Sequence, residues 1–201
     1  MMDTMFTMPD LNNGFLVYID KKFYNKKQSD KIYKKLIDEI QYDENSIIKI
    51  MGKEIAIPRK QTAYGDPGMS YSFSGTRVNA KSWLPFLLKI KDDIELQTNE
   101  KFNFCLVNYY ENGNNYIGYH SDDEKELGKE PSIVSISFGA TRKFYFKSKI
   151  DKNLPVKKIS LNHGCLCYIM HPTNKYWKHS VPKEPKIDSP RINLTFRYIY
   201  D

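Results

Sequence analysis

A chain of 201 residues, 40% of them hydrophobic and 27% charged, is long enough for one folded domain and too apolar for global disorder. The formal net charge of +7 favours a polyanionic partner such as a nucleic acid. No run approaches the roughly 20 apolar residues of a membrane span, and the N-terminus lacks a secretory pattern. We therefore expect a soluble intracellular protein with a single domain over 1–201.

The three cysteines are not spaced like a disulfide framework or a metal site. Their number is odd, there is no CxxC motif, and two of them stand too close on one predicted strand to bridge each other. We expect Cys105, Cys165 and Cys167 to be buried, unreactive thiols in a reducing compartment.

Two helices are predicted in the first hundred residues. Apolar residues recur at helical spacing over 29–41, where Ser29 is the expected N-cap. A second apolar stripe covers 81–96, with Ser82 as the expected cap.

Short strands separated by turn residues follow residue 100. Their number and spacing predict an α+β fold that is mainly β, a sandwich or jelly roll with the early helices packed on one sheet. The predicted strands are 14–20, 102–110, 116–120, 133–138, 142–146, 156–161, 165–170, 177–181 and 191–198.

His120 and Asp122 form an H-x-D pair at the end of a predicted strand, where side chains two apart point to the same side. With His179 on a later strand, two imidazoles and one carboxylate would leave one face of an octahedron open. That arrangement suits an Fe(II) that binds both a cosubstrate and oxygen. An isolated H-x-D is more often a surface coincidence. His163 and His171 lack a carboxylate at this spacing, and we expect them to be structural or exposed to solvent.

The last predicted strand has one polar and one apolar face. Two arginines on one face of such a strand are costly to bury unless they meet an anion, although an exposed edge strand is the simpler alternative. A dicarboxylate would match two guanidinium groups, and Asn108 and Tyr110 could complete its cradle. Iron beside a dicarboxylate pocket is typical of a 2-oxoglutarate oxygenase. The polar face consists of Arg191, Asn193, Thr195 and Arg197.

Four segments in this order resemble the signature segments of the AlkB-type Fe(II)/2-oxoglutarate-dependent nucleic acid dioxygenases: NYYENGNNYIGYHSDDE, SISFGATRKFYF, HPTNKYWKHSVP and PRINLTFRYI. The upstream segment IPRKQTAYGDPGMSYSFSG is most similar to the branch with the second and third human homologues, and closest to the second. The resemblance covers about 50–199. It implies a double-stranded β-helix, or jelly roll, over 102–199, preceded by a loose tail at 1–14 and a nucleotide-recognition lid at 45–80.

The resemblance also implies roles for individual residues. His120, Asp122 and His179 match the catalytic iron ligands. Arg191 matches the arginine that pairs with the distal carboxylate of 2-oxoglutarate, and Arg197 the one nearer its chelating end. The further hydrogen-bonding partners of this cosubstrate would be Asn108, Tyr110, Asn193 and Thr195.

Substrate contacts are implied in the same way. In the lid, Tyr71, Phe73 and Ser74 would cover the damaged base, while Asp123 and Glu124 would lie near its exocyclic edge. Met51 would be the tip of a finger that fills the gap left by an extruded base. Arg59 fits a contact with the nucleic acid backbone. The loop 183–186 departs from the family pattern, because Glu184 and Pro185 replace basic residues and weaken its grip on phosphate.

The activity implied is oxidative demethylation of N-alkylated adenine and cytosine in DNA, a direct reversal of alkylation damage that releases formaldehyde, succinate and CO2. The base would be flipped out of the duplex, and we expect a monomer that binds no membrane. Three alternatives remain open: an RNA or protein demethylase of the same chemistry, a non-catalytic basic nucleic acid-binding module, and a zinc hydrolase on the same ligands. The last leaves the two arginines of the final strand unexplained.

Overall fold

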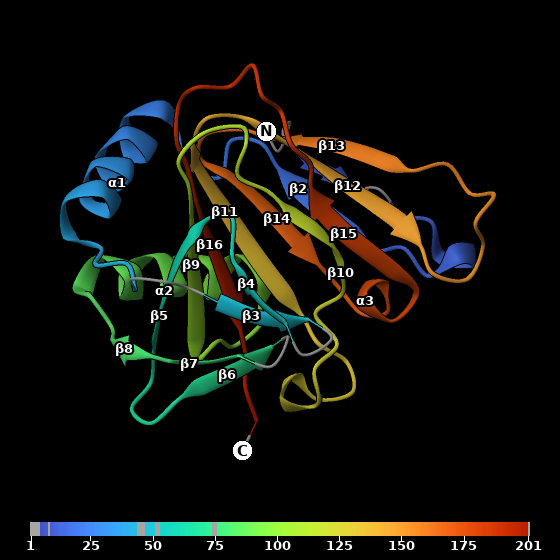
Figure 1. Cartoon of the computed structure of the whole chain (residues 1–201), viewed down its shortest axis with the longest axis horizontal. Coiled ribbons are helices and arrows are strands. Elements are labelled where there is room, and N and C mark those ends of the chain that lie inside the picture. The colour runs from blue at the N-terminus through green and yellow to red at the C-terminus, as the bar shows by residue number, and fades with distance from the viewer. Residues whose placement is uncertain (1–4, 8, 44–46, 51–52, 74–75, 201) are drawn as a thin grey trace.

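The computed structural model describes residues 5–7, 9–43, 47–50, 53–73 and 76–200. An eight-stranded sheet, antiparallel except at one edge, runs through the molecule (Figure 1). Its strands in spatial order are β1 (Met5–Thr7), β2 (Val17–Asp20), β14 (Cys165–Ile169), β11 (Ile133–Gly139), β16 (Arg191–Arg197), β9 (Phe104–Tyr110), β5 (Lys60–Gly65) and β8 (Lys81–Ser82).

A smaller sheet faces the large one. Side chains from both sheets form one buried cluster, to which Leu106 and Ile133 contribute from the large sheet and Phe146 and Trp177 from the small one. The strands of the small sheet in spatial order are β10 (Ile117–His120), β15 (Trp177–Val181), β12 (Arg142–Ser148) and β13 (Lys157–Leu161).

Helices α1 (Lys26–Glu39) and α2 (Pro85–Thr98) cover the opposite face of the large sheet (Figure 1). Their buried residues Leu36 and Ile90 belong to a second cluster with Val107, Ile136 and Leu194 of the sheet. Two facing antiparallel sheets with helices on one side make the predicted jelly roll, and this fold is confirmed. None of the described helices is both long enough and apolar enough to cross a membrane.

Both predicted helix caps were wrong. Helix α1 begins earlier, because Asn25 and Gln28 form a capping box in which each side chain accepts a hydrogen bond from the other's backbone N–H, both at 3.0 Å. Ser29 lies inside the helix and is buried. Ser82 belongs to β8, and α2 begins after Leu84 without a side-chain cap, with Pro85 in its first turn.

All the predicted strands exist, with ends shifted by no more than three residues. Except for β2, the strands of the N-terminal half were not predicted from the sequence. Two of the missed hairpins lie within the predicted lid 45–80: β3 (Ile47–Ile50) with β4 (Lys53–Ala56), and β6 (Ser70–Phe73) with β7 (Thr76–Asn79). The short helix α3 (Thr173–Tyr176) was also missed, and part of the predicted tail forms β1 and pairs with β2.

The prediction of buried thiols is confirmed. Cys105, Cys165 and Cys167 are all free and buried. Burial raises the pKa of each thiol, that of Cys165 to about 12, so the reactive thiolate form is suppressed.

Candidate functional site

The predicted triad comes together on two neighbouring strands of the small sheet. His120 ends β10 and is the register partner of His179 on β15, and Asp122 follows two residues after β10. One potential ligand atom from each of the three lies within 4.8 Å of the others. The pairing of β10 with β15 shifts by one residue between Ile117 and His120, which marks a β-bulge beside the triad.

Burial prepares these side chains to bind a cation. It lowers the pKa of both imidazoles, that of His179 to about 3, so both rings are neutral near pH 7 with a lone pair to offer. The Nδ1 of His120 lies 3.0 Å from the carbonyl of Gly118. When Nδ1 carries the proton, it donates to this carbonyl and leaves Nε2 for a metal. Burial opposes ionisation of Asp122, yet the positive charge of Arg197 holds its pKa below the usual value.

The polar face of β16 points into the space between the two sheets, away from the helices. Arg191 donates to Ser137 Oγ at 2.8 Å and to Asn193 Oδ1 at 2.7 Å, and Asn193 donates to Thr195 Oγ1 at 2.7 Å. Ser135 also donates to Asn193 Oδ1, at 2.7 Å. The alternative of an exposed edge strand is therefore wrong: β16 lies between β11 and β9, and every one of its residues is buried.

Three arginines in this region are almost completely buried, and their charges are balanced differently. Arg142 forms an ion pair with Glu184 at 3.1 Å, and Arg197 forms one with Asp122 at 2.8 Å. Arg191 has no ion pair within the described residues, although it is only 2% exposed, and its Nε and Nη1 have no hydrogen-bond acceptor. A buried cation without a carboxylate is costly. The unpaired charge of Arg191 therefore indicates an anion-binding site.

The residues present fit Fe(II) and 2-oxoglutarate. The triad supplies the two-imidazole, one-carboxylate donor set of non-haem iron oxygenases. The unpartnered nitrogens of Arg191 suit the distal carboxylate. Arg197, whose Nε and Nη1 are likewise without acceptors, touches a triad member and therefore lies at the metal end. The family resemblance implies the same order for the two arginines, and the assignment of each to one end of 2-oxoglutarate stays a prediction.

Asn108 and Tyr110 extend the cradle from β9. Asn108 Oδ1 accepts hydrogen bonds from Gln61 Nε2 at 2.7 Å and from Arg59 Nε at 2.8 Å, so its orientation is fixed. The ring of Tyr110 lies 5.2 Å from the guanidinium carbon of Arg191. The predicted cosubstrate residues therefore line one common wall.

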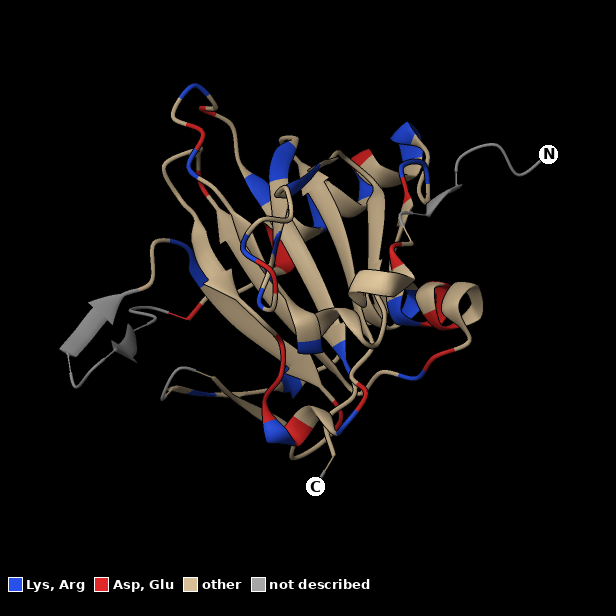
Figure 2. Ribbon diagram, turned by 90° about the vertical axis from the view of Figure 1, so that its right-hand side faces the viewer, with Lys and Arg blue, Asp and Glu red and all other residues tan. Residues whose placement is uncertain are grey.

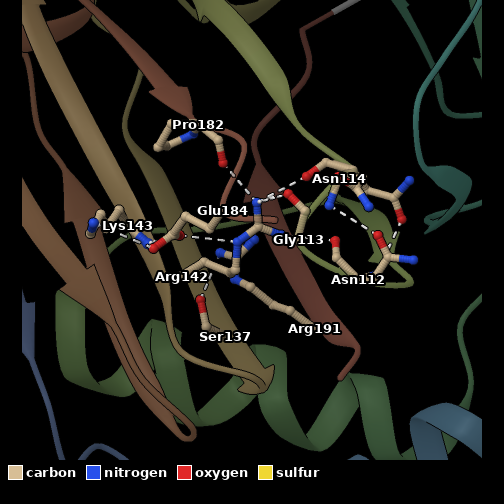
Figure 3. A network of polar contacts seen from close by, with 10 residues as sticks. Asn112, Gly113, Asn114, Ser137, Arg142, Lys143, Pro182, Glu184 and Arg191 are labelled. Atoms are coloured by element: carbon tan, nitrogen blue, oxygen red, sulfur yellow. Dashed lines mark hydrogen bonds and ion pairs between the residues drawn. The ribbon is translucent and has the colours of Figure 1, made fainter. Parts of the chain in front are cut away.

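Arg142 is a component that the sequence reading missed. Its guanidinium donates to the Glu184 carboxylate at 3.1 Å (Figure 3). The guanidinium carbon lies 5.7 Å from the centroid of the Tyr110 ring, which also contacts Arg191. The same guanidinium donates to four backbone carbonyls, those of Asn112, Gly113, Asn115 and Pro182. It thereby ties the loop after β9 to the loop after β15 and packs near Tyr110 at the edge of the cradle.

Glu184 is committed to this network. Its carboxylate also accepts from the backbone N–H of Lys143 at 2.8 Å (Figure 3). The approach of the two loops is so close that a Cβ at Gly113 would lie 1.8 Å from the Glu184 carbonyl oxygen. Glu184, which distinguishes the loop 183–186 from the basic loop of the family, therefore has a structural role.

Replacing Arg142 with methionine is expected to lower the free energy of unfolding by about 3–5 kcal/mol, the usual cost of breaking a buried ion pair. Glu184 and the four carbonyls would lose their donor. Chemical denaturation measures this. The matched control is Lys143→Met on the same strand, because Lys143 is exposed and its ammonium lies 3.8 Å from Glu184, a surface pair worth about 1 kcal/mol or less. Equal losses in the two variants would contradict the role of Arg142.

The predicted substrate residues lie at the other end of the same region. Tyr71 is buried, donates its hydroxyl to Glu124 at 2.5 Å and lies 4.8 Å from the guanidinium carbon of Arg197. Phe73 is half-buried beside Tyr71, with ring centroids 5.4 Å apart. Asp123 is exposed and paired with Lys149 at 2.9 Å. Met51 and Ser74 lie outside the described residues.

Arg59 is half-buried, and its guanidinium donates to Asn108 Oδ1 and to the carbonyl of Tyr116. Its contact with the nucleic acid backbone stays a prediction. His163 and His171 lie apart from the triad. His163 accepts from the backbone N–H of Gly139 at 2.9 Å, which is the structural role expected of it.

A cavity of about 740 Å³ connects these groups. Apolar side chains from both sheets line it, including Leu106, Ile133, Phe144 and Val181. The cavity is also lined by the triad and by most of the other predicted site residues: Arg191, Arg197, Asn108, Tyr110, Asn193, Thr195, Tyr71, Phe73, Asp123, Glu124 and Arg59.

Ser135, Ser137 and Gln61 are site residues that the sequence reading missed. Ser135 and Ser137 alternate with apolar residues on β11, directly opposite Thr195 and Asn193 of β16. This period-two pattern was visible in the sequence and could have identified them. Gln61 had no comparable signal, because only the pairing of β5 with β9 brings it opposite Asn108.

Residues 16–197 match the family model of the 2OG-Fe(II) oxygenase superfamily. The chain therefore belongs to this superfamily of enzymes, which use Fe(II) with 2-oxoglutarate and O2, and within it to the AlkB type. It is 41% identical over 184 residues to DNA oxidative demethylase ALKBH2 of Bos taurus, covering 88% of this chain and 66% of that protein. Identity to the Homo sapiens protein of the same name is 40%, over 88% of this chain and 70% of the relative.

A solved structure supports the fold. That of OsALKBH1 superimposes with a TM-score of 0.63 over 90% of this chain and 96% of its own, at 18% identity. The predicted family is thus confirmed from sequence and the predicted fold from structure.

Proposed function

We propose that the protein catalyses oxidative demethylation of N-alkylated adenine and cytosine in DNA. His120, Asp122 and His179 hold the iron, and Arg191 binds the distal carboxylate of 2-oxoglutarate. The observation that carries this assignment is the buried, uncompensated charge of Arg191 in the same cavity as the triad. The choice of DNA rests on the relatives that are DNA oxidative demethylases by name.

The remaining cosubstrate contacts follow from the hydrogen bonds of the cradle. Asn193 is oriented by Ser135 and Arg191, and it holds Thr195 in turn. Asn108 is oriented by Gln61 and Arg59. These fixed side chains pre-organise the pocket, so little ordering remains to be done when the cosubstrate binds.

The methylated base enters the part of the cavity between Tyr71, Phe73 and the acidic pair. As carboxylates, Asp123 and Glu124 accept hydrogen bonds from the exocyclic amino group of adenine or cytosine. Tyr71 fixes Glu124 by its hydroxyl, and burial raises the pKa of Glu124. Flipping the base out of its stack brings it into this part of the cavity. Because a methylated base has lost its pairing, the free-energy cost of flipping it is lower. The protein acts as a monomer on this substrate.

When bound, iron with 2-oxoglutarate and O2 supplies the oxidation that converts the N-methyl group to formaldehyde and the cosubstrate to succinate and CO2. The chain's own residues position the reactants. Arg191 and the cradle orient 2-oxoglutarate, the lid orients the base, and the apolar lining excludes water. Arg197 maintains the charge and orientation of Asp122 through their hydrogen bond at 2.8 Å.

Turnover on oligonucleotides with 1-methyladenine or 3-methylcytosine tests the proposal. Mass spectrometry of single-stranded and duplex DNA should detect loss of the methyl group, dependent on both Fe(II) and 2-oxoglutarate. The same strands made of RNA test the alternative substrate. Failure on every nucleic acid, with succinate still formed on another substrate, would reject a repair function while leaving the oxygenase chemistry intact.

A further inference from the structure

Two tyrosines on one strand segment lie exposed at the mouth of the cavity. Tyr116 is 36% and Tyr119 is 41% exposed, and both line the cavity together with the triad. Tyr119 directly precedes the metal-ligand candidate His120. No step of the proposed demethylation uses either ring.

The β-bulge accounts for the position of Tyr119. Ile117 pairs with Val181 and His120 with His179, so two residues of β10, Gly118 and Tyr119, stand opposite the single residue between those partners. In a regular strand, neighbouring side chains point to opposite faces. Because a bulge re-aims side chains, Tyr119 and His120 both line the same cavity.

Positive charges accompany the two rings. The ammonium of Lys183 lies 4.8 Å from the ring centroid of Tyr116. Lys178, exposed on β15, lines the cavity next to His179. In the part of the chain that the structure describes, neither lysine has an ion pair. Elsewhere on the molecule, basic and acidic residues are interspersed over strands, loops and helices (Figure 2). Exposed aromatic rings beside unpaired cations are the recognition chemistry of single-stranded nucleic acids, in which bases stack and phosphates are neutralised.

We propose that Tyr119, assisted by Tyr116, stacks on an unpaired nucleobase that flanks the target nucleotide, and that Lys178 and Lys183 neutralise the adjoining phosphates. The preferred substrate is then single-stranded DNA or an unpaired stretch. In a duplex the flanking base is already stacked and paired, and freeing it costs a few kcal/mol, which offsets the gain from the tyrosine. This inference rests on the proposed function because it concerns the same cavity.

The test is binding of a fluorescently labelled, unmethylated single-stranded DNA 12-mer and of its duplex, measured by anisotropy at one fixed salt concentration. Base–aromatic stacking predicts that Tyr119→Leu weakens single-strand binding roughly five- to tenfold, with less than about a twofold change for the duplex. Tyr119→Phe keeps the ring and should bind like wild type. Tyr116→Leu should give a loss in the same direction.

Tyr145→Leu is the matched control. Tyr145 also lies under a lysine, with Lys158 at 5.4 Å from its ring, but it does not line the cavity. Its substitution should leave single-strand binding unchanged. The ultraviolet–visible spectrum of each variant with Fe(II) and 2-oxoglutarate verifies that the neighbouring metal site is intact.

Equal loss of single-strand and duplex binding in Tyr119→Leu, no loss at all, or the same loss in Tyr145→Leu would overturn the stacking assignment. Because the binding probe carries no methyl group, its result does not depend on turnover. If the wild-type protein binds DNA through Tyr119 but demethylates neither single-stranded nor duplex DNA, the proposed function is contradicted and the stacking assignment is not.

Discussion

Substitution of Asp122 by asparagine is expected to abolish iron binding and turnover while the fold is retained. Asparagine keeps an oxygen that can accept the hydrogen bond of Arg197, but it removes the anionic ligand from the triad. Loss of a direct ligand should weaken metal affinity by more than the roughly 10- to 100-fold typical of an outer-shell partner. Equilibrium dialysis against Fe(II), with metal analysis of the retained protein, measures the change.

Two further variants separate metal binding from stability. Asp122→Ala leaves the buried Arg197 without the carboxylate and without any hydrogen-bond acceptor at this position, so its free energy of unfolding should fall by about 3–5 kcal/mol. Asp123→Ala removes an exposed neighbour that forms an ion pair with Lys149, and it should retain iron. Full iron retention by Asp122→Asn, or equal iron loss in Asp123→Ala, would contradict the assignment of the triad.

Arg191→Met is expected to weaken 2-oxoglutarate binding roughly 30-fold or more, since truncating one member of a buried, hydrogen-bonded charge pair costs about 2–5 kcal/mol. The same substitution should affect the stability of the cosubstrate-free protein differently. Methionine has a similar length, and it removes a buried cation that has no ion pair among the described residues. Stability without 2-oxoglutarate should therefore not decrease.

Thermal unfolding with and without 2-oxoglutarate measures both the loss of cosubstrate binding and the stability of the cosubstrate-free protein. The wild type should gain in Tm when the cosubstrate is added, because a ligand that binds only the folded state stabilises it. Arg191→Met should start at an equal or higher Tm and lose the gain. A large fall in Tm without cosubstrate would mean that Arg191 is structural.

The sequence was most informative where local periodicity coincides with function. The polar and apolar faces of β16 could be predicted from alternation alone. The two-residue spacing likewise predicted that His120 and Asp122 lie together, although Asp122 follows the end of β10. The burial of β16 follows from its central place in the sheet, which accounts for the cost of its arginines and hence the need for an anion.

What could not be predicted depends on contacts distant in sequence. The ion pair of Arg197 with Asp122 joins the large sheet to the segment that follows β10 of the small sheet. Gln61 meets Asn108 only after β5 pairs with β9. Arg142 looked like an ordinary basic residue of a strand, since its partners are mostly backbone carbonyls of two loops. The lid strands β6 and β7 were missed because each has only four residues, too few for the alternation of serine and aromatic residues in β6 to stand out.

The account requires one cavity that holds Fe(II) and 2-oxoglutarate together. The most direct test is the visible absorption spectrum of the purified protein after anaerobic addition of Fe(II) and then 2-oxoglutarate. We predict a charge-transfer band that needs both additions, is absent in Asp122→Asn and is restored in Arg191→Met only at much higher 2-oxoglutarate. No band with the wild type, or an unchanged band in Asp122→Asn, would contradict the iron and 2-oxoglutarate site.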